Sequence, residues 1–406
     1  MGTVPKSARE GFHMSMTGQD NNQISSGPRP RMTPVRQQNQ ALNILEFKAG
    51  TIELKSRPLV VILELTQNCN LSCPMCRQGS GYRRDWDMSQ ATFDLIAESL
   101  FDTAMVIDLR GYGESTLVRN FLSHVQTAAD SGAHLRLVTN GQVNKERDWE
   151  FLMSVHSSIL ISCDAADEQL FRHLRQGGTL ERLEMTVRNI NKYRDFYHVP
   201  RNLVSLLSIV SRSNLHDLSN IIKLARRLDV QKVSFFPIQV PLNDGRHLSG
   251  DVEGTHRALA EAQKCACELG IELHVGAALD ASIALKGDVK KLCMHPWAFA
   301  YVSHDGGVGF CDHLIGNRKY VLGNIRDGSF MEIWNNPGFQ TLRRSHQERQ
   351  IPHQFAACRW CYKQRYVDFE HMVHPDFTEH YVSTKTKQTL LGWSDLTDGE
   401  RLSFLV

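Results

Sequence analysis

The sequence lacks three features, and each absence argues against a class of protein. No run of about 18 consecutive apolar residues occurs, which is the length that a membrane-spanning helix needs. The formal charge is only +2 over 406 residues, so the composition does not indicate binding to nucleic acid. The N-terminal stretch MGTVPKSAREGFHMSMTGQDNNQ has no apolar core of the kind that a secretion signal carries. We therefore expect a cytoplasmic protein that binds no membrane and no nucleic acid.

The composition that is present fits a protein with substantial hydrophobic cores. Hydrophobic residues make up 41% of the chain and charged residues 22%, which suits one large or two medium globular domains. Residues 1–50 differ, because Gln, Asn, Ser, Pro and Arg dominate there and few apolar side chains offset the entropy of ordering the backbone. We predict that residues 1–50 form a disordered polar tail.

Residues 51–285 repeat one pattern, in which an apolar run is followed by a loop and then by an amphipathic segment. In SQATFDLIAESLF, for example, Phe93, Ile96, Ala97 and Leu100 form one apolar stripe at helical spacing. Apolar strands that alternate with helices indicate a parallel sheet with helices on its outer side. Six such units predict an α/β fold, a partial (βα)6 barrel similar to a TIM barrel. The strands are expected at residues 58–65, 104–109, 134–139, 158–163, 203–210 and 232–238, with a further strand at 271–275.

The pattern changes in the last third of the chain. Residues 286–365 contain short segments, Gly-rich turns such as HDGGVGF, and several aromatic residues. We predict a small second domain over residues 286–365 and a C-terminal extension over residues 366–406.

Ten cysteines occur in this chain without any sign of export. Cytosolic reductants keep thiols reduced, so metal binding explains these cysteines better than disulfides do. Three of them, Cys69, Cys73 and Cys76, fall within eight residues, directly after the first predicted strand. A second group, near the end of the chain, consists of Cys293, Cys311, Cys358 and Cys361.

The first group contains three cysteines, not four. A structural zinc site normally takes four protein ligands, so this group does not complete one. An iron–sulfur cluster can be held by three thiolates, and the iron that has no protein ligand then stays open to a small molecule. The odd number of thiols therefore favours a cluster that also binds a small molecule.

These residues resemble a known family. CNLSCPMC, from Cys69 to Cys76, resembles the CxxxCxxC loop of radical S-adenosylmethionine (SAM) enzymes. The resemblance implies a 4Fe-4S cluster held by Cys69, Cys73 and Cys76, with SAM bound to the open iron and cleaved to a 5′-deoxyadenosyl radical. It also implies the partial barrel of this family and an electron donor such as flavodoxin or ferredoxin.

The resemblance further implies which residues contact SAM. They lie at the carboxyl ends of the predicted strands, the face on which barrel active sites are built. GYGES is similar to the family's Gly-rich segment for the methionine amino group, and Met75 stands in place of an aromatic residue that packs on the adenine. The expected SAM contacts are Met75, Gly111, Tyr112, Gly113, Glu114, Thr139, Asn140, Ser162, Asp164 and Ser211.

The second cysteine group resembles the SPASM/twitch extension of the same family. Between and around its cysteines stand Pro-Trp, an Asp-Gly hairpin, Leu-Gly-Asn-Ile and Ile-Trp, in the family's order. The resemblance implies an auxiliary 4Fe-4S cluster held by Cys293, Cys311, Cys358 and Cys361. A structural zinc site with four thiolates is the alternative, but it does not account for the three-cysteine loop.

Two residues are candidates for a catalytic role. Cys163 ends the fourth predicted strand, and Arg175 stands where relatives carry a polar residue that reaches SAM or substrate. Packing in the core is the alternative for Cys163, and a charge at a helix end is the alternative for Arg175.

The resemblance narrows the reaction to hydrogen abstraction from a substrate. An auxiliary cluster with four protein ligands has no free site for substrate, so we expect it to accept an electron. This favours oxidation of a small-molecule sugar or aminocyclitol alcohol to a ketone in antibiotic biosynthesis, as in enzymes of the 2-deoxy-scyllo-inosamine dehydrogenase type. The alternatives are crosslinking or epimerisation of a ribosomal peptide, a redox-neutral sugar epimerase or decarboxylase, and a non-catalytic iron–sulfur or zinc module.

Overall fold

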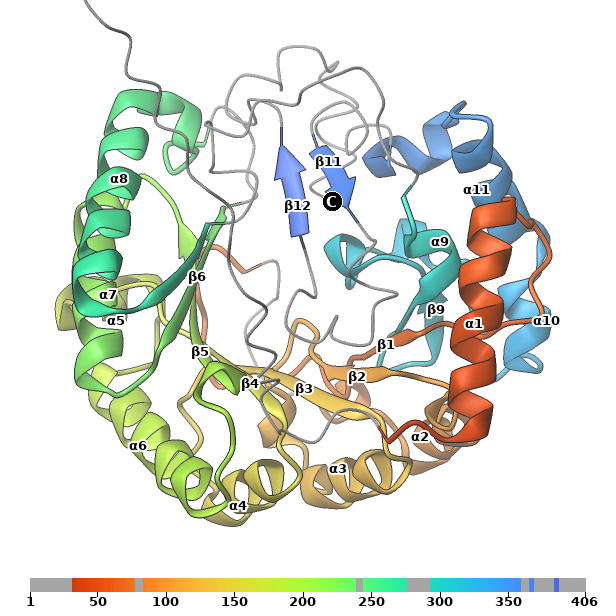
Figure 1. Cartoon of the computed structure of the whole chain (residues 1–406), viewed down its shortest axis with the longest axis horizontal. Coiled ribbons are helices and arrows are strands. Elements are labelled where there is room, and N and C mark those ends of the chain that lie inside the picture. Colours follow the sequence, from red (N-terminus) through yellow and green to blue (C-terminus); the bar gives the residue numbers. More distant parts are fainter. Residues whose placement is uncertain are drawn as a thin grey trace, which may run out of the picture.

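The first part of the chain folds as an incomplete barrel of parallel strands with helices on its outer side, which confirms the predicted fold class (Figure 1). The computed structural model describes residues 31–76, 83–238, 244–275 and 293–358, and the backbone of residues 365–368 and 383–386. The strands are β1 (Val60–Leu63), β2 (Val106–Leu109), β3 (His134–Thr139), β4 (Ser158–Ser162), β5 (Val204–Val210), β6 (Lys232–Pro237) and β7 (Glu272–Val275). The helices are α2 (Gln90–Ile96), α3 (Phe121–Asp130), α4 (Glu146–Ser154), α5 (Glu168–Leu174), α6 (Leu180–Phe196), α7 (Leu218–Arg227) and α8 (Val252–Leu269).

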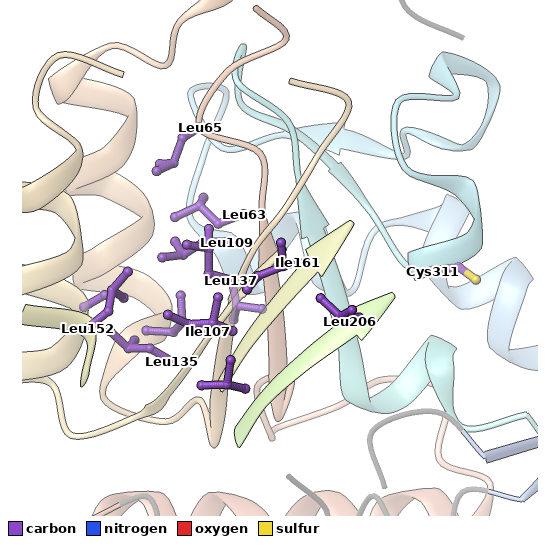
Figure 2. Packing of buried hydrophobic residues seen from close by; sticks show 14 of the residues in the cluster. Leu63, Leu65, Ile107, Leu109, Leu135, Leu137, Leu152, Ile161, Leu206 and Cys311 are labelled. Atoms are coloured by element: carbon purple, nitrogen blue, oxygen red, sulfur yellow. The ribbon is translucent and has the colours of Figure 1, made fainter. Parts of the chain in front are cut away.

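Alternate residues of each strand face the helices or the barrel interior. Ile107 and Leu109 of β2 lie in the main hydrophobic cluster, together with apolar side chains of the surrounding helices (Figure 2). Asp108 stands between them in the strand and therefore faces the interior. The same alternation puts Glu64, directly after β1, and Arg136 of β3 on the interior side. The barrel thus has an apolar outer layer and an interior that carries charge.

The second part of the chain continues the barrel's sheet. β8 (Phe299–Val302) pairs in parallel with β1 on the side opposite β2. Within the described residues the sheet therefore has ten strands, in the order β10-β9-β8-β1-β2-β3-β4-β5-β6-β7. The chain then turns back twice, because β9 runs antiparallel to both β8 and β10. The elements of this part are α9 (His295–Ala298), β8, β9 (Gly307–Gly309), β10 (Gly323–Asn324), α10 (Phe330–Trp334) and α11 (Pro337–Gln347).

The expected disorder of residues 1–50 is wrong for residues 34–49, which form the helix α1 (Pro34–Ala49). Thr33 caps its start, and Gly50 ends it in the left-handed conformation at φ 67°. Hydrophobic periodicity gave no sign of this helix because its buried residues are polar, namely Arg36, Asn39, Gln40, Asn43 and Glu46. Their hydrogen bonds supply the stability that apolar contacts supply elsewhere.

Polar side chains of α1 reach both parts of the chain. Arg36 bonds to backbone carbonyls next to the barrel strands, whereas the Asn43 amide donates to the carbonyl of Trp297 in α9 at 2.8 Å. Helix α1 therefore holds the start of the second part against the barrel, and α1 and α9 lie beside each other in Figure 1.

Two further findings concern the chain as a whole. Beyond residue 358 the structure describes only β11 (Arg365–Asp368) and β12 (Ser383–Thr386), which pair antiparallel, so most of the predicted extension lies outside the described residues. Among the described helices, none combines the length and the hydropathy that crossing a bilayer requires. The domain boundaries at residues 285 and 365 stay predictions.

Replacement of Arg36 tests the polar packing of α1. Its buried guanidinium donates to the carbonyls of Ala104 at 2.7 Å, Arg31 at 2.6 Å, and Phe101 and Ser131 at 3.0 Å. Arg36→Met keeps the side-chain stem but leaves these carbonyls without their donor, so we expect the free energy of unfolding in urea to fall by about 3 kcal/mol. Val35→Ala is the matched control because Val35 is 54% exposed. Equal urea midpoints for the two variants would contradict this account.

Candidate functional site

The three-cysteine loop starts where β1 ends and is fastened at its base. Thr66 forms an isolated bridge with Asp87, and its hydroxyl donates to the Asp87 carboxylate at 2.5 Å. The amide of Asn68 donates to the Arg83 carbonyl and to Asp87, both at 2.8 Å, and accepts from the Arg83 backbone N–H at 2.7 Å. These bonds fix where the loop leaves the barrel, one residue before Cys69.

The three thiols lie close enough to influence one another, as a shared cluster requires. Burial raises the pKa of Cys69 to about 11, and the thiol of Cys73 adds to the shift. Burial also raises the pKa of Cys73, against the effect of the Arg175 guanidinium, and Cys76 adds to that shift. Bound iron would favour the thiolates instead. Cys73 thus lies near both Cys69 and Cys76, and three neighbouring thiols on one loop fit a cluster held by three ligands.

Gly111 and Gly113 of the GYGES segment allow this segment to lie against the end of β1 and the cysteine loop. A Cβ on Gly113 would lie 2.4 Å from the carbonyl oxygen of Thr66 and 2.6 Å from that of Asn68. A Cβ on Gly111 would lie 2.3 Å from Cγ of Glu64. The resemblance implies that these glycines contact SAM, and in the structure each one also lies against a neighbouring segment of the chain.

Glu114 joins the GYGES segment to the segment after β3. Its carboxylate accepts hydrogen bonds from the Thr116 hydroxyl at 2.7 Å, the Thr139 hydroxyl at 2.9 Å and the Asn140 backbone N–H at 2.7 Å. Burial raises the pKa of Glu114, and these bonds oppose the shift. The Asn140 side chain in turn donates toward Cys69 Sγ at 3.6 Å, so Glu114 positions a hydrogen-bond donor to the first thiol.

Asp164 and Arg175 form a buried ion pair beside the cysteine loop. Arg175 Nε lies 2.6 Å from Asp164 Oδ2, and the other carboxylate oxygen accepts the Ile209 backbone N–H at 2.7 Å. Burial lowers the pKa of Arg175, but Asp164 and Cys73 outweigh it and raise the pKa. The loop after Arg175 also holds the cysteine loop directly, since the Ser72 N–H donates to the Gln176 carbonyl at 2.9 Å. Arg175 is therefore a cation fixed next to Cys73.

Cys163 has surroundings that do not suit the predicted catalytic role. It lies fully buried in the main hydrophobic cluster, and its thiol donates to the Ala165 carbonyl at 3.3 Å. Burial raises its pKa to about 12. A thiol in this position packs the core, which is the alternative that the sequence left open.

Two cysteines of the second group, Cys293 and Cys311, lie beside a histidine and an aspartate. His295 Nδ1 lies 3.4 Å from Cys293 Sγ, and His295 Nε2 lies 3.0 Å from Asp312 Oδ1. Asp312 follows Cys311, and one ligand atom each of His295, Cys311 and Asp312 lie within 4.8 Å of one another. Cys358 is also buried, whereas Cys361 lies outside the described residues. Donors of this kind fit an iron–sulfur cluster.

A chain of charged contacts links the second cysteine group to the barrel interior. Arg110 Nη2 lies 3.1 Å from Asp312, and Arg110 Nε lies 2.8 Å from Asp108. Asp108 also accepts from Arg136 Nη1 at 2.6 Å. Arg110, His295 and His313 outweigh burial and hold the pKa of Asp312 well below its usual range. Asp108 and Asp312 thus each have a cationic partner, which offsets the cost of their burial.

Comparison with known families shows to which family the chain belongs. The model of the radical SAM superfamily matches residues 63–225, and that of the SPASM iron–sulfur cluster-binding domain matches residues 293–362. The chain is a radical SAM enzyme with a SPASM domain. Its cofactors are therefore SAM, a SAM-binding 4Fe-4S cluster and an auxiliary cluster.

Several known radical SAM proteins are similar to this chain. PqqA peptide cyclase of Bradyrhizobium diazoefficiens is 26% identical over 200 residues, which cover 48% of this chain and 50% of the cyclase, so the chain spans about half of that relative's length. Mycofactocin maturase MftC of Mycolicibacterium smegmatis is 24% identical over 320 residues, 75% of each chain. SuiB of Streptococcus suis with bound SAM has a TM-score of 0.56 at 14% identity, over 75% of this chain and 72% of SuiB. Because only 14% of the residues are identical, the likeness to SuiB shows the fold alone.

The other predicted SAM contacts lie near the carboxyl ends of the barrel strands. Ser162 ends β4, and Ser211, held by Asn214 at 2.8 Å, follows β5; both are buried. Met75 is partly buried against the main cluster, and the ring of Tyr112 lies against Gly316 of the SPASM domain. Contact of all these residues with SAM stays a prediction.

Sequence reasoning missed the charged residues that link the two parts of this radical SAM enzyme. Glu64 and Asp108 each stand inside an otherwise apolar strand segment, VILEL and MVIDL, and both are fully buried. A charge in such a run was a usable signal, because a buried carboxylate needs a partner. Arg110, one partner of Asp108, stands only two residues further along the chain. His304, the partner of Glu64, comes from a turn 240 residues away, whose position no local pattern reveals.

Cysteine variants test the two cluster sites separately. Anaerobically reconstituted protein should hold about eight irons, as two 4Fe-4S clusters require. Cys73→Ala should hold about half of this iron and cleave no SAM, because the first cluster lacks a ligand. Cys358→Ala should also lose about half but keep some reductive SAM cleavage. Cys267→Ala, at an exposed position on α8, is the control and should match the unaltered protein in iron and in 5′-deoxyadenosine.

Glycine variants test the close approach of the GYGES segment. Gly113→Ala forces a Cβ against two backbone carbonyls, whereas a Cβ on Gly245 meets nothing within 4 Å. We expect Gly113→Ala to lower both the melting temperature and the iron content of the first cluster, and Gly245→Ala to change neither. If Gly113→Ala and Gly245→Ala have equal iron contents and equal melting temperatures, the close approach of Gly113 to the cysteine loop does not stabilise the first cluster.

Proposed function

We propose that this radical SAM enzyme is a maturase that modifies a ribosomally made peptide by crosslinking or epimerisation. The observation that carries the proposal is the likeness to PqqA peptide cyclase and mycofactocin maturase, whose names describe peptide cyclisation and maturation. SuiB, which shares the fold, has been solved with a precursor peptide. The sequence by itself favours oxidation of a small sugar or aminocyclitol alcohol. The relatives instead support a peptide substrate over a small molecule.

In this proposal the cysteine loop and its neighbours form the site of the first chemical step. Cys69, Cys73 and Cys76 hold the first cluster, and the segment from Gly111 to Glu114 lies beside it and contacts SAM. When bound, the reduced cluster and SAM supply a 5′-deoxyadenosyl radical that abstracts hydrogen from substrate. Asn140 donates toward Cys69, and the Asp164–Arg175 pair presents a fixed cation next to Cys73.

The second cysteine group holds the auxiliary cluster in this proposal. Its ligands are Cys293, Cys311, Cys358 and Cys361, of which the structure describes the first three. Asp312 contacts His295 and pairs with the charge of Arg110 beside this group. Four protein ligands leave no place for substrate, so an electron-transfer role follows, with flavodoxin or ferredoxin as the donor to the enzyme.

Mass spectrometry of candidate precursor peptides tests the function. The reconstituted enzyme, SAM and a reductant are incubated with peptides encoded by short reading frames beside its gene. Crosslinking removes a pair of hydrogen atoms from the peptide, and epimerisation in deuterated water adds deuterium at an α-carbon. We expect one of these changes, and its loss in Cys73→Ala. If every peptide stays unchanged while a sugar or aminocyclitol panel yields a ketone, the enzyme is a small-molecule dehydrogenase instead.

A further inference from the structure

We propose that Glu64 is a positioning residue through which the SPASM domain holds the SAM-binding loop in place. The inference rests on the SAM-binding role proposed for Gly111 to Glu114. It does not depend on the identity of the substrate. It concerns the junction of β1 with its two neighbours, β2 of the barrel and β8 of the SPASM domain.

The carboxylate of Glu64 lies between three segments of the chain. Oε2 accepts the backbone N–H of Tyr112, in the GYGES segment, at 3.1 Å. Oε1 accepts the Gln67 amide, at the base of the cysteine loop, at 3.0 Å. His304 Nδ1, in the turn between β8 and β9, lies 3.2 Å from the same oxygen. One side chain therefore bonds to the SAM loop, the cysteine loop and the SPASM domain.

Glu64 has no freedom to move independently of these partners. The residue is 0% exposed, and its own backbone N–H donates to the Val302 carbonyl of β8 at 3.0 Å. Gly111 packs directly on its side chain, where a Cβ would lie 2.3 Å from Cγ. A shift of the SPASM turn at His304 is thus transmitted to Tyr112 without intervening flexible residues.

The SAM loop meets the SPASM domain a second time through Tyr112. Gly316 adopts a φ of 69°, and a Cβ there would lie 2.1 Å from the Tyr112 ring. The backbone of Tyr112 is therefore held by Glu64 and its ring by the SPASM loop. The first contact reaches the SPASM domain through His304, and the second reaches it directly, so this domain sets the position of the loop that the family uses for SAM.

The use of a charged residue supports a positioning role beyond simple packing. A buried carboxylate costs more to desolvate than a neutral amide, so a neutral residue would be the cheaper way to fill this space. Only a carboxylate, however, presents two oxygens that both accept. Tyr112 N–H and Gln67 Nε2 both donate and approach opposite oxygens, so an amide at position 64 keeps both bonds only if the Gln67 amide turns over.

Glu64→Gln tests this inference on the holoenzyme without a peptide substrate. The variant keeps the volume of the side chain but turns one acceptor into a donor, facing either Tyr112 or Gln67. We expect the KM for SAM in uncoupled 5′-deoxyadenosine formation to rise about tenfold, as one lost hydrogen bond predicts. The rate at saturating SAM and the iron content should change less than about twofold. The change that SAM causes in the electron paramagnetic resonance spectrum of the reduced cluster should need correspondingly more SAM.

His304→Ala and two controls separate positioning from other effects. His304→Ala removes the contact between Glu64 and His304 but leaves the bonds of Glu64 to Tyr112 and Gln67. Like Glu64→Gln, it should raise the KM for SAM. Glu98→Gln, at an exposed position, and Arg318→Gln, which pairs with Asp305 in the same SPASM turn, should leave this KM unaltered.

Three results would overturn the inference. They are an unaltered KM for SAM in Glu64→Gln, a loss of the first cluster in that variant, and an unaltered KM in His304→Ala. If Glu64→Gln does not fold, His304→Ala decides the question by itself. Because no peptide is present, failure here leaves the proposed peptide maturation open, and failure of maturation leaves this inference open.

Discussion

The structure depends on the pairing of β1 with a strand on each side. Val60 pairs with Val106 of β2 and with Phe299 of β8, so one four-residue strand belongs to the barrel and to the SPASM domain at once. The cysteine loop starts at the end of this strand. Since both neighbours run parallel to β1, their carboxyl ends meet at the same edge, and the loops that follow them converge on the cysteine loop.

The charged interior follows from this arrangement. A sheet that is covered by helices on its outer face needs apolar residues there, but its interior positions are free to carry charge if each charge has a partner. Asp108 shares its carboxylate between Arg110 and Arg136, and Arg110 also reaches Asp312. The contacts run from the barrel interior to the residue beside Cys311. Both cysteine groups are therefore linked to the sheet by paired charges and hydrogen bonds as well as by apolar packing.

The wrong expectation, disorder of residues 34–49, has a physical cause. Helix α1 buries Arg36 and Asn43, whose bonds are to backbone carbonyls far away in the sequence, so composition alone suggested a disordered tail. Polar residues do bury when their donors are satisfied, and only the tertiary structure supplies the acceptors. The preference for a small substrate rested on the electron-accepting role expected of the auxiliary cluster, and not on any residue that contacts a substrate.

Local sequence determined the alternation of strands and helices, the three-thiol loop after β1 and the second cysteine group, because periodicity, chain turns and ligand spacing are properties of neighbouring residues. It also put the polar motifs at strand ends, which a parallel sheet gathers at one edge. Only the tertiary structure decided that β8 joins β1, that Cys163 lies in the core, and that Glu64 meets His304. Glu64 and His304 are 240 residues apart, and a contact at that separation depends on the complete fold, which brings strands from both parts into one sheet.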